Sequence, residues 1–423
     1  MPATSSPDHG SGCPDVGALE TAAVVTVGTE LTTGHRLDTN GAEVALALVN
    51  AGYVVAEMVS VPDDRGAIER VLRGLTARHK MVIVTGGLGP THDDVTREAA
   101  AQVLGRTLIR DAAIAEALAA RVSVHHEPAS MLSLLHQADV IDGARVLGAT
   151  TGTAPGQVIE NAGHTLVILP GPPHEMRPML HQALSGRVAA APPVTLRCVG
   201  ITESDAGSRV LPLIERYPDV ELTLLGGPGQ VDVILVSRSG DPASLSDATA
   251  AAFAALGDSC FSSDGSTLPE TVIRLATERG VRLATAESCT GGLVAAALTD
   301  VPGSSQVFGG SVIAYANETK SALLEVDPAL LAAHGAVSEP VARAMARGAL
   351  GIPGTTLAVA TTGIAGPGGG SPDKPLGTVW FAVATAAGVE FAEQHRYGGD
   401  RMMVRHRALT TALDLLRRSL LER

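Results

Sequence analysis

The stretch Ala286-Glu287-Ser288-Cys289-Thr290-Gly291-Gly292 follows a short apolar run, 281–285, and precedes a segment of helical composition, 293–298. We therefore predict a buried strand that turns through small residues into a helix. The start of a helix offers free N–H groups and a positive end, which can hold an oxyanion while a neighbouring Ser288 or Cys289 attacks. Alternatively, Ser288 only caps the helix and Cys289 only fills the core.

Apolar and helical segments alternate on both sides of this motif. The pattern predicts helices over 268–279 and 340–350 and strands over 357–361 and 378–384. The strand at 357–361 runs into the small-residue segment 362–366, much as the first one runs into Ser288. Such alternation is typical of an α/β domain.

The first half of the chain shows the same alternation. Apolar runs of strand length occupy 22–27, 53–61, 81–85 and 165–169, and helical patterns lie between the first three. We predict a mostly parallel, three-layer α/β domain with right-handed crossovers. Ligands of such sheets bind beyond the carboxyl ends of the strands, where the glycines and carboxylates of this half gather.

The third of these strands ends in Gly86-Gly87-Leu88-Gly89, with Asp93 and Asp94 shortly after. No Lys-Ser/Thr follows the glycines, and their spacing is not G-x-G-x-x-G, so neither common nucleotide motif is present. The glycines instead predict a backbone cradle for a phosphate, and a divalent cation would relieve the repulsion between that phosphate and the carboxylates. Alternatively, the two aspartates cap a helix. The stiff loop 170–173 can hold Glu175 toward the same edge of the sheet.

Residues 191–262 differ from both halves. Their pattern predicts the order β-α-β-β-α, which resembles a KH-like domain. A G-x-x-G string, 226–229, lies between two predicted strands, where it is typical of a hairpin turn. An RNA-gripping string would need neighbouring helices and basic residues. We interpret this segment as a spacer and an assembly surface.

The composition limits the possible partners. The chain has 423 residues and a net charge of −13, which argues against general binding of nucleic acid or of anionic membranes. Its four cysteines are scattered without C-x-x-C spacing, which predicts neither a disulfide framework nor a zinc site. Residues 1–20 are typical of a disordered tail, and no apolar run is long enough to cross a membrane. We expect a cytoplasmic protein.

Three clusters of the first half together resemble the molybdopterin-binding-like domain of the CinA (competence/damage-inducible) family. They are 28–40, 85–96 and 170–176. The resemblance implies hydrolysis of the pyrophosphate of ADP-ribose or related dinucleotides, assisted by magnesium, manganese or cobalt. It implies metal binding by Asp64, Asp93 and Asp94 and substrate binding by Glu30, Asn40, Gly86, Gly87 and Gly89. The sequence departs from the family pattern at Thr29, where an aspartate is common, and at Thr32, where a leucine is common.

The last third, 266–423, is similar to a PncC-type nicotinamide mononucleotide deamidase domain. The matching strings are 286–292, 302–305, 315–320, 335–338, 363–367 and 399–401. The resemblance implies a nucleophile, Ser288, with Tyr315 and Lys320 as its catalytic partners and no cofactor. A lysine whose ammonium form is disfavoured by burial can act as the base. The expected substrate-binding residues are Thr290, Gly291, Gly292, Ser304, Asn317, Thr362, Gly363, Ala365, Gly366, Arg401 and Arg405.

The residues alone leave alternatives to these roles. Cys289 is a rival nucleophile, because a helix start activates a thiolate. Lys320 is otherwise a solvated surface charge, and Tyr315 is otherwise a plain core residue. At Thr362 the family pattern has serine, but the hydroxyl is kept.

The domain prediction is a tail (1–20), a molybdopterin-binding-like domain (21–190), a KH-like domain (191–262) and a deamidase domain (266–423). We expect a bifunctional hydrolase of pyridine-nucleotide salvage that acts on small nucleotides as a homodimer, with no nucleic-acid or membrane partner. The alternative is a non-catalytic nucleotide-binding assembly factor or competence-related factor.

Overall fold

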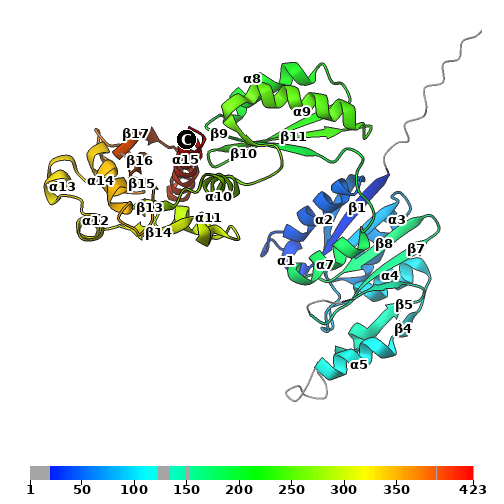
Figure 1. Ribbon diagram of the computed structural model, residues 1–423. Helices are drawn as coiled ribbons and strands as arrows, with labels where there is room; N and C mark the ends of the chain where they lie inside the picture. The colour runs from blue at the N-terminus through cyan, green and yellow to red at the C-terminus, as the bar shows by residue number, and fades with distance from the viewer. Residues whose placement is uncertain (1–19, 122–133, 149–151, 387, 423) are drawn as a thin grey trace, which may run out of the picture. The chain divides into compact units, whose positions relative to one another are not determined.

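The structure is a computed structural model that describes residues 20–121, 134–148, 152–386 and 388–422 (Figure 1). The predicted tail lies outside these ranges apart from its last residue. The chain forms two compact units. The first runs to Pro193 and includes Ser237–Pro242, and the second holds the remaining residues.

The first unit is built on a six-stranded sheet with the strand order β2-β1-β3-β8-β7-β6. The strands are β1 (Thr21–Val27), β2 (Val54–Val61), β3 (Met81–Thr85), β6 (Arg145–Leu147), β7 (Gly156–Asn161) and β8 (His164–Leu169). The first four in this order are parallel, and β7 and β6 are antiparallel to their neighbours. The four strands predicted from apolar runs are confirmed. Their carboxyl ends lie at one edge of the sheet, as expected of a parallel arrangement.

Helices cover both faces of this sheet (Figure 1). The helices of this unit are α1 (Thr29–Thr32), α2 (Thr39–Asn50), α3 (Arg65–Thr76), α4 (Thr96–Leu104), α5 (Ala112–Arg121) and α7 (Pro173–Ala183), with the 3-10 turn η1 (His136–Ala138). A small ribbon pairs β4 (Leu108–Arg110) with β5 (Asp139–Ile141), and α5 lies beside this ribbon (Figure 1). Buried residues of α2 and α7 pack on one face, and those of α3 and α4 on the other. The predicted three-layer α/β architecture is confirmed.

The segment after Pro193 forms a separate four-stranded sheet within the second unit, with the order β10-β11-β9-β12. Its elements are β9 (Val194–Val199), α8 (Glu203–Ile214), β10 (Val220–Gly227), β11 (Gln230–Ser237), α9 (Pro242–Leu256), the 3-10 turn η2 (Gly257–Ser259) and β12 (Cys260–Ser262). The predicted β-α-β-β-α order is present, with β12 added at an edge. The G-x-x-G string lies in the β10–β11 hairpin, as predicted. Gly229 adopts a positive φ of 80° there, a conformation that glycine allows at little cost.

The last third of the chain folds around a five-stranded sheet with the order β14-β13-β15-β16-β17. Its elements are α10 (Leu268–Arg279), β13 (Leu283–Glu287), α11 (Leu293–Thr299), the 3-10 turn η3 (Ser304–Gln306), β14 (Phe308–Ile313), α12 (Asn317–Leu324), α13 (Pro328–His334), α14 (Glu339–Ala349), β15 (Leu357–Gly363), β16 (Thr378–Thr385), β17 (Gly388–Arg396) and α15 (Arg401–Leu421). Strands β14, β13 and β15 are parallel, and β16 and β17 continue antiparallel.

The two faces of this sheet carry side chains of different size. Along β15, Leu357 and Val359 face the core shared with α10, α11 and α15, whereas Ala358 and Ala360 face the core shared with α14. The alternation follows from the two-residue period of a strand. Small side chains let α14 approach the sheet closely, which explains how a chain with 2% aromatic residues packs densely.

No helix within the described ranges is long and apolar enough to cross a membrane.

Candidate functional site

Ser288 and Lys320 meet in the last third of the chain. The Lys320 Nζ lies 3.1 Å from the Ser288 Oγ, although the residues are 32 positions apart. The same amine donates to the main-chain oxygens of Ala314, at 2.8 Å, and Tyr315, at 3.3 Å. The Lys320 side chain is buried, with 1% of its surface exposed. Lys320 is therefore not a solvated surface charge.

Strand pairing explains how these distant residues come together. Ser288 directly follows β13, and its amide donates to the Thr361 main-chain oxygen of the neighbouring β15. On the other side β14 runs parallel to β13, and pairing continues past its end because the Ala314 amide donates to the Glu287 oxygen. The chain then enters α12, whose first turn carries Lys320 back toward β13.

Burial changes the protonation of Lys320. Loss of water around the amine lowers the pKa of Lys320 from its ordinary value, against a smaller opposing effect of nearby negative groups. The neutral amine is the form that can accept a proton from a hydroxyl. The 3.1 Å contact and the lowered pKa are both features that a serine–lysine nucleophile–base pair requires.

Cys289 is a poor competitor for the role of nucleophile. Its side chain belongs to the hydrophobic core beneath α11 and α15. Burial raises the pKa of Cys289 to about 12, so the reactive thiolate is suppressed. Cys289 is thus a core residue, as the alternative interpretation of the sequence proposed.

Tyr315 is placed differently from the prediction. Tyr315 is 61% exposed, and its hydroxyl accepts a 2.8 Å hydrogen bond from the Arg401 guanidinium. It is not the plain core residue of the alternative interpretation. Only its main-chain oxygen contacts the Lys320 amine. The resemblance implied Tyr315 as a catalytic partner, but its phenol hydroxyl is turned toward Arg401 at the start of α15 and not toward Ser288.

The start of α11 also differs from the prediction of free N–H groups. The Glu287 carboxylate accepts hydrogen bonds from the amides of Gly292 (2.9 Å), Val294 (3.1 Å) and Ala295 (2.8 Å). Glu287 is completely buried. A carboxylate at this position satisfies donors that have no partner within the helix and lies at the positive end of the helix dipole. The Glu287 side chain therefore caps the start of α11, a role that the sequence analysis did not assign to it. Ser288 does not cap this helix.

We expect Glu287→Ala to lower the free energy of unfolding of the second unit by about 3 kcal/mol, because it leaves buried amides without an acceptor. The matched control is Glu318→Ala, which removes an exposed carboxylate from the first turn of α12. This control should cost less than about 0.5 kcal/mol. Urea denaturation of both variants measures the difference, and equal costs would show that the Glu287 cap contributes little.

Three of the predicted substrate-binding side chains instead hold the site together. The Thr290 hydroxyl bonds to that of Thr361, at 2.7 Å, and the Thr362 hydroxyl donates to the Ala336 main-chain oxygen, at 2.8 Å. Arg405 donates to the main-chain oxygens of Cys289 and Thr290, at 3.1 and 2.7 Å. Helix α15 thereby fastens the turn that carries Ser288.

The other predicted residues fall into two groups. Gly291, Gly292, Ser304, Gly363, Ala365 and Gly366 belong to turns or strand ends of this unit. Arg401 lies at the surface, where it donates to the Gly366 oxygen at 2.8 Å as well as to Tyr315. Asn317 lines a groove of about 860 Å³ between α12 and α13 whose lining residues do not include Ser288.

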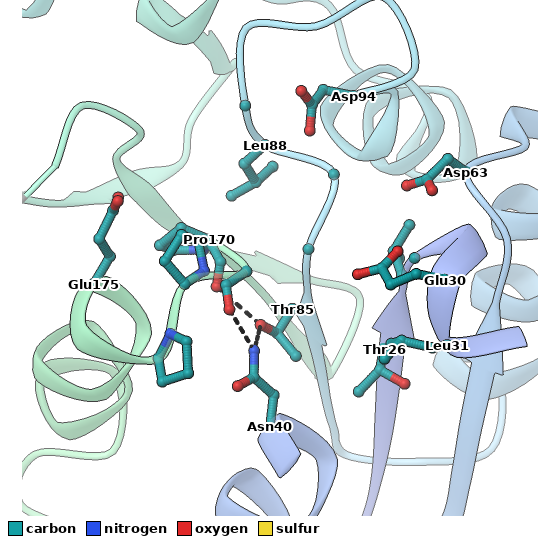
Figure 2. A pocket seen from close by; sticks show the side chains of 18 of the residues that line it. Thr26, Glu30, Leu31, Asn40, Asp63, Thr85, Leu88, Asp94, Pro170 and Glu175 are labelled. Carbon is teal, nitrogen blue, oxygen red and sulfur yellow. Dashed lines mark hydrogen bonds between the residues drawn. The ribbon is translucent and has the colours of Figure 1, made fainter. Parts of the chain in front are cut away.

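The first unit has a pocket of about 1060 Å³ at the carboxyl ends of its parallel strands. Predicted residues Glu30, Asn40, Gly86, Gly87 and Gly89 all line it. Figure 2 shows Glu30 and Asp63 on the opposite side of the pocket from Glu175. Burial raises the pKa of the Glu175 carboxyl above its ordinary value. The structure thus brings together the three clusters that the sequence keeps 45 or more positions apart.

Two polar side chains fix the loops around this pocket. The Asn40 amide donates to the Thr85 hydroxyl, at 3.1 Å, and to the Gly171 main-chain oxygen, at 2.6 Å (Figure 2). Arg97 is buried beneath the glycine-rich loop and donates to the Leu88 oxygen, at 2.8 Å. Nothing in the sequence pattern distinguished Arg97 from an ordinary surface residue of α4.

The three predicted metal ligands have different positions. Asp94 lines the pocket, and its carboxylate accepts hydrogen bonds from the amide and hydroxyl of Thr91. Asp93 is not among the pocket-lining residues, and Asp64 accepts from the Ala67 amide as the N-cap of α3. Its neighbour Asp63 lines the pocket instead. Helix capping does not explain Asp93 or Asp94, because α4 begins after Val95 without a side-chain cap.

Gly86, in the glycine-rich loop, has no room for a side chain. A β-carbon there would lie 2.2 Å from the Val27 main-chain oxygen, at a φ of 105°. Gly86→Ala should therefore destabilise the first unit by several kcal/mol. The matched control is Gly34→Ala, also at positive φ (75°) but in open space, which should cost about 1 kcal/mol. Thermal unfolding compares the two, and similar losses would contradict the close approach.

Comparison with known proteins identifies two family domains in the chain. Residues 23–190 match the family model described as "Probable molybdopterin binding domain", and residues 265–420 match the "CinA C-terminal domain". A relative from Symbiobacterium thermophilum, named as a competence-damage inducible protein, is 43% identical over 422 residues, which cover 95% of this chain and 99% of the relative. The chain belongs to the CinA family. A CinA-like protein of Acidobacterium capsulatum is 39% identical over 421 residues, 95% of this chain and 100% of the relative.

A solved CinA-family structure corresponds to part of the chain. The competence/damage inducible protein CihA from Agrobacterium tumefaciens is 43% identical, covers 36% of this chain and 93% of its own, and has a TM-score of 0.34. The two family matches leave residues 191–264 between them, the region of the four-stranded middle sheet.

Proposed function

We propose that the C-terminal part of this CinA-family protein is a cytoplasmic amidase that converts nicotinamide mononucleotide to nicotinate mononucleotide and ammonia. The observation that carries the proposal is the 3.1 Å contact between the buried Lys320 amine and the Ser288 hydroxyl. Breaking a carboxamide needs a nucleophile, a base to deprotonate it and an acid for the leaving nitrogen. This pair can supply all three.

The partners of Lys320 define how its protons are used. A neutral amine has two N–H bonds and one lone pair. The main-chain oxygens of Ala314 and Tyr315 can only accept, so they take the two N–H bonds. In the structure the Lys320 amine donates to the Ser288 oxygen. In the neutral form that we propose for catalysis, the lone pair faces this hydroxyl and accepts its proton. The two carbonyl groups thus orient Lys320 as a base.

The proposed reaction has two steps, acylation of Ser288 and hydrolysis of the acyl-serine. Lys320 takes the Ser288 proton while the serine oxygen bonds to the amide carbon, and the resulting ammonium gives a proton to the departing NH₂ group, which leaves as ammonia. Water next attacks the acyl-serine, again losing a proton to Lys320. The ester bond breaks and the proton returns to Ser288. The carboxylic acid that is released then ionises to a carboxylate and gives its proton to water.

The donors for the oxyanion must lie elsewhere than at the capped amides of α11. The amides of Gly292, Val294 and Ala295 already donate to Glu287. The amides of Cys289 and Thr290 do not donate to that carboxylate, and they are our candidates for the oxyanion hole. Arg401, exposed beside Gly366, is our candidate for the substrate phosphate.

The purified full chain provides the test of this activity. Incubation with nicotinamide mononucleotide should release ammonia and nicotinate mononucleotide in equal amounts, without added metal. Binding of the nucleotide without ammonia release would instead support the non-catalytic assembly or competence-related factor.

For the first unit we propose metal-assisted hydrolysis of the pyrophosphate of ADP-ribose or a related dinucleotide. Its pocket, of about 1060 Å³, has the size of a nucleotide site. Glycines 86, 87 and 89 line this pocket, which lies where ligands of parallel sheets bind.

The residues present fit a divalent cation that is shared with the substrate. Among the described residues no three His, Cys, Asp or Glu side chains converge as a ready-made metal site. Glu30, Asp63 and Asp94 nevertheless line the pocket. Magnesium, manganese or cobalt can be held by one or two carboxylates together with phosphate oxygens, and it then polarises the phosphoryl group.

Asp94→Asn tests this second activity. Asparagine keeps an acceptor for the Thr91 amide but removes the charge, so we expect AMP release from ADP-ribose to fall at least about a hundred-fold. Asp93→Asn, which changes a neighbouring carboxylate outside the pocket, should change it less than about three-fold. Unchanged turnover in Asp94→Asn would show that Asp94 only shapes the loop.

A further inference from the structure

Two cysteines that are far apart in sequence face each other in the middle sheet. Cys198 of β9 pairs directly with Cys260 of β12 in the antiparallel register. Side chains of directly paired residues project from the same face of the sheet. Neither thiol belongs to the proposed active sites.

The pairing satisfies the geometric requirement of a disulfide. Directly opposed residues of antiparallel strands have Cα atoms about 4.5 to 5.5 Å apart. Disulfides span Cα separations of about 4.4 to 6.8 Å. A bond between these sulfur atoms therefore needs no large movement of the backbone.

The two sulfur atoms already interact. The interaction of the two thiols raises the pKa of Cys198 and lowers the pKa of Cys260, while burial acts against ionisation of both. The Arg417 guanidinium contributes to the lowered pKa of Cys260. The direction of these shifts makes Cys260 our choice for the sulfur that reacts first.

The position of β12 gives an oxidant access to the pair. This strand has three residues and lies at the edge of its sheet, with an irregular register between Cys260 and Ser262. Short edge strands open locally at low cost. By contrast Cys289 lies in the hydrophobic core of the C-terminal sheet.

We propose that Cys198 and Cys260 form a reversible disulfide that fastens β12 to β9 under oxidising conditions. With hydrogen peroxide as oxidant, the Cys260 thiolate attacks one peroxide oxygen, the O–O bond breaks and hydroxide leaves, which gives a sulfenic acid. The Cys198 sulfur then attacks the Cys260 sulfur. The S–O bond breaks, the S–S bond forms, and water leaves with the Cys198 proton.

The disulfide would fix the strand that leads into the C-terminal domain. β12 is followed by a short connection to α10, which packs on α15 in the C-terminal domain. A covalent bond here closes a long loop, 198–260, and restricts the unfolded chain. Oxidation should therefore stabilise the second unit.

The test uses the full-length Cys13→Ser protein, so that the cysteine outside the described residues takes no part. After peroxide treatment we expect one disulfide-linked peptide pair containing Cys198 and Cys260, lighter by about 2 Da for two lost hydrogens and reversed by dithiothreitol. Cys289 should stay alkylatable after unfolding. The melting temperature should rise by several degrees on oxidation.

Adding Cys260→Ser should abolish both the linked peptide and the rise in melting temperature. Independent over-oxidation of the two thiols, links to Cys289 or to a second chain, or two thiols that remain alkylatable after prolonged treatment would each overturn the proposal.

Discussion

Replacement of Ser288 by alanine is expected to reduce kcat for ammonia release from nicotinamide mononucleotide by at least about a thousand-fold. The serine oxygen is the atom that forms the bond to the amide carbon, and the Lys320 amine lies 3.1 Å from it with no other hydroxyl as an alternative contact in the described structure. Stopped-time ammonia assays on the purified full chain measure the change.

The matched control is the neighbouring residue. Cys289→Ser changes a core thiol whose pKa burial raises to about 12, so kcat should stay within about ten-fold of the original protein. Thermal unfolding of both variants separates loss of chemistry from loss of folding. If Cys289→Ser were as inactive as Ser288→Ala while remaining folded, the assignment of the nucleophile would be reversed.

Replacement of Lys320 by methionine should lower kcat/KM by about a thousand-fold, the size expected for loss of a general base. Methionine fills much of the buried volume without a charge, so we expect the melting temperature to be maintained or raised. The matched control is Lys374→Met, which also removes an amine bonded to a main-chain oxygen, that of His334. Its kcat/KM should change less than about three-fold.

The pH dependence distinguishes a base from a merely structural lysine. The active form of Lys320 is deprotonated, so kcat/KM should rise with pH and level off above the pKa of Lys320. Burial lowers that pKa from 10.5, so the rise should occur at lower pH than for a free lysine. In Lys320→Met the residual activity should lack this rise. A variant that keeps the original pH profile would contradict the role of Lys320 as the base.

Much of the fold follows from local sequence patterns. The runs at 22–27, 81–85 and 357–361 are almost wholly apolar and short, which is typical of strands buried on both faces, and each forms the predicted strand. Strands β6 and β7 were not predicted. β6 is only three residues long, and β7 carries a glutamine, a glutamate and an asparagine, so neither shows the apolar run that marked the others.

The strings 286–292 and 315–320 also indicated the chemistry, because the resemblance tied Ser288 to Lys320. Two side chains that the resemblance implied as site residues lie elsewhere in the structure. Tyr315 was expected beside the serine, but it lies one residue past the last pairing of β14 and turns toward Arg401. Asp64 was expected at the metal site, but it caps α3 while Asp63 lines the pocket.

The sequence by itself determined most of the strands and helices, the two CinA-family domains and, through the family resemblance, the candidates for nucleophile and base. Only the tertiary structure decided that Lys320 is buried, that Glu287 occupies the start of α11, and that Cys198 faces Cys260. Local patterns arise from periodicity and backbone preference within a few residues. Burial, protonation and pairing depend instead on which distant segments pack together, and no short stretch of sequence encodes that choice.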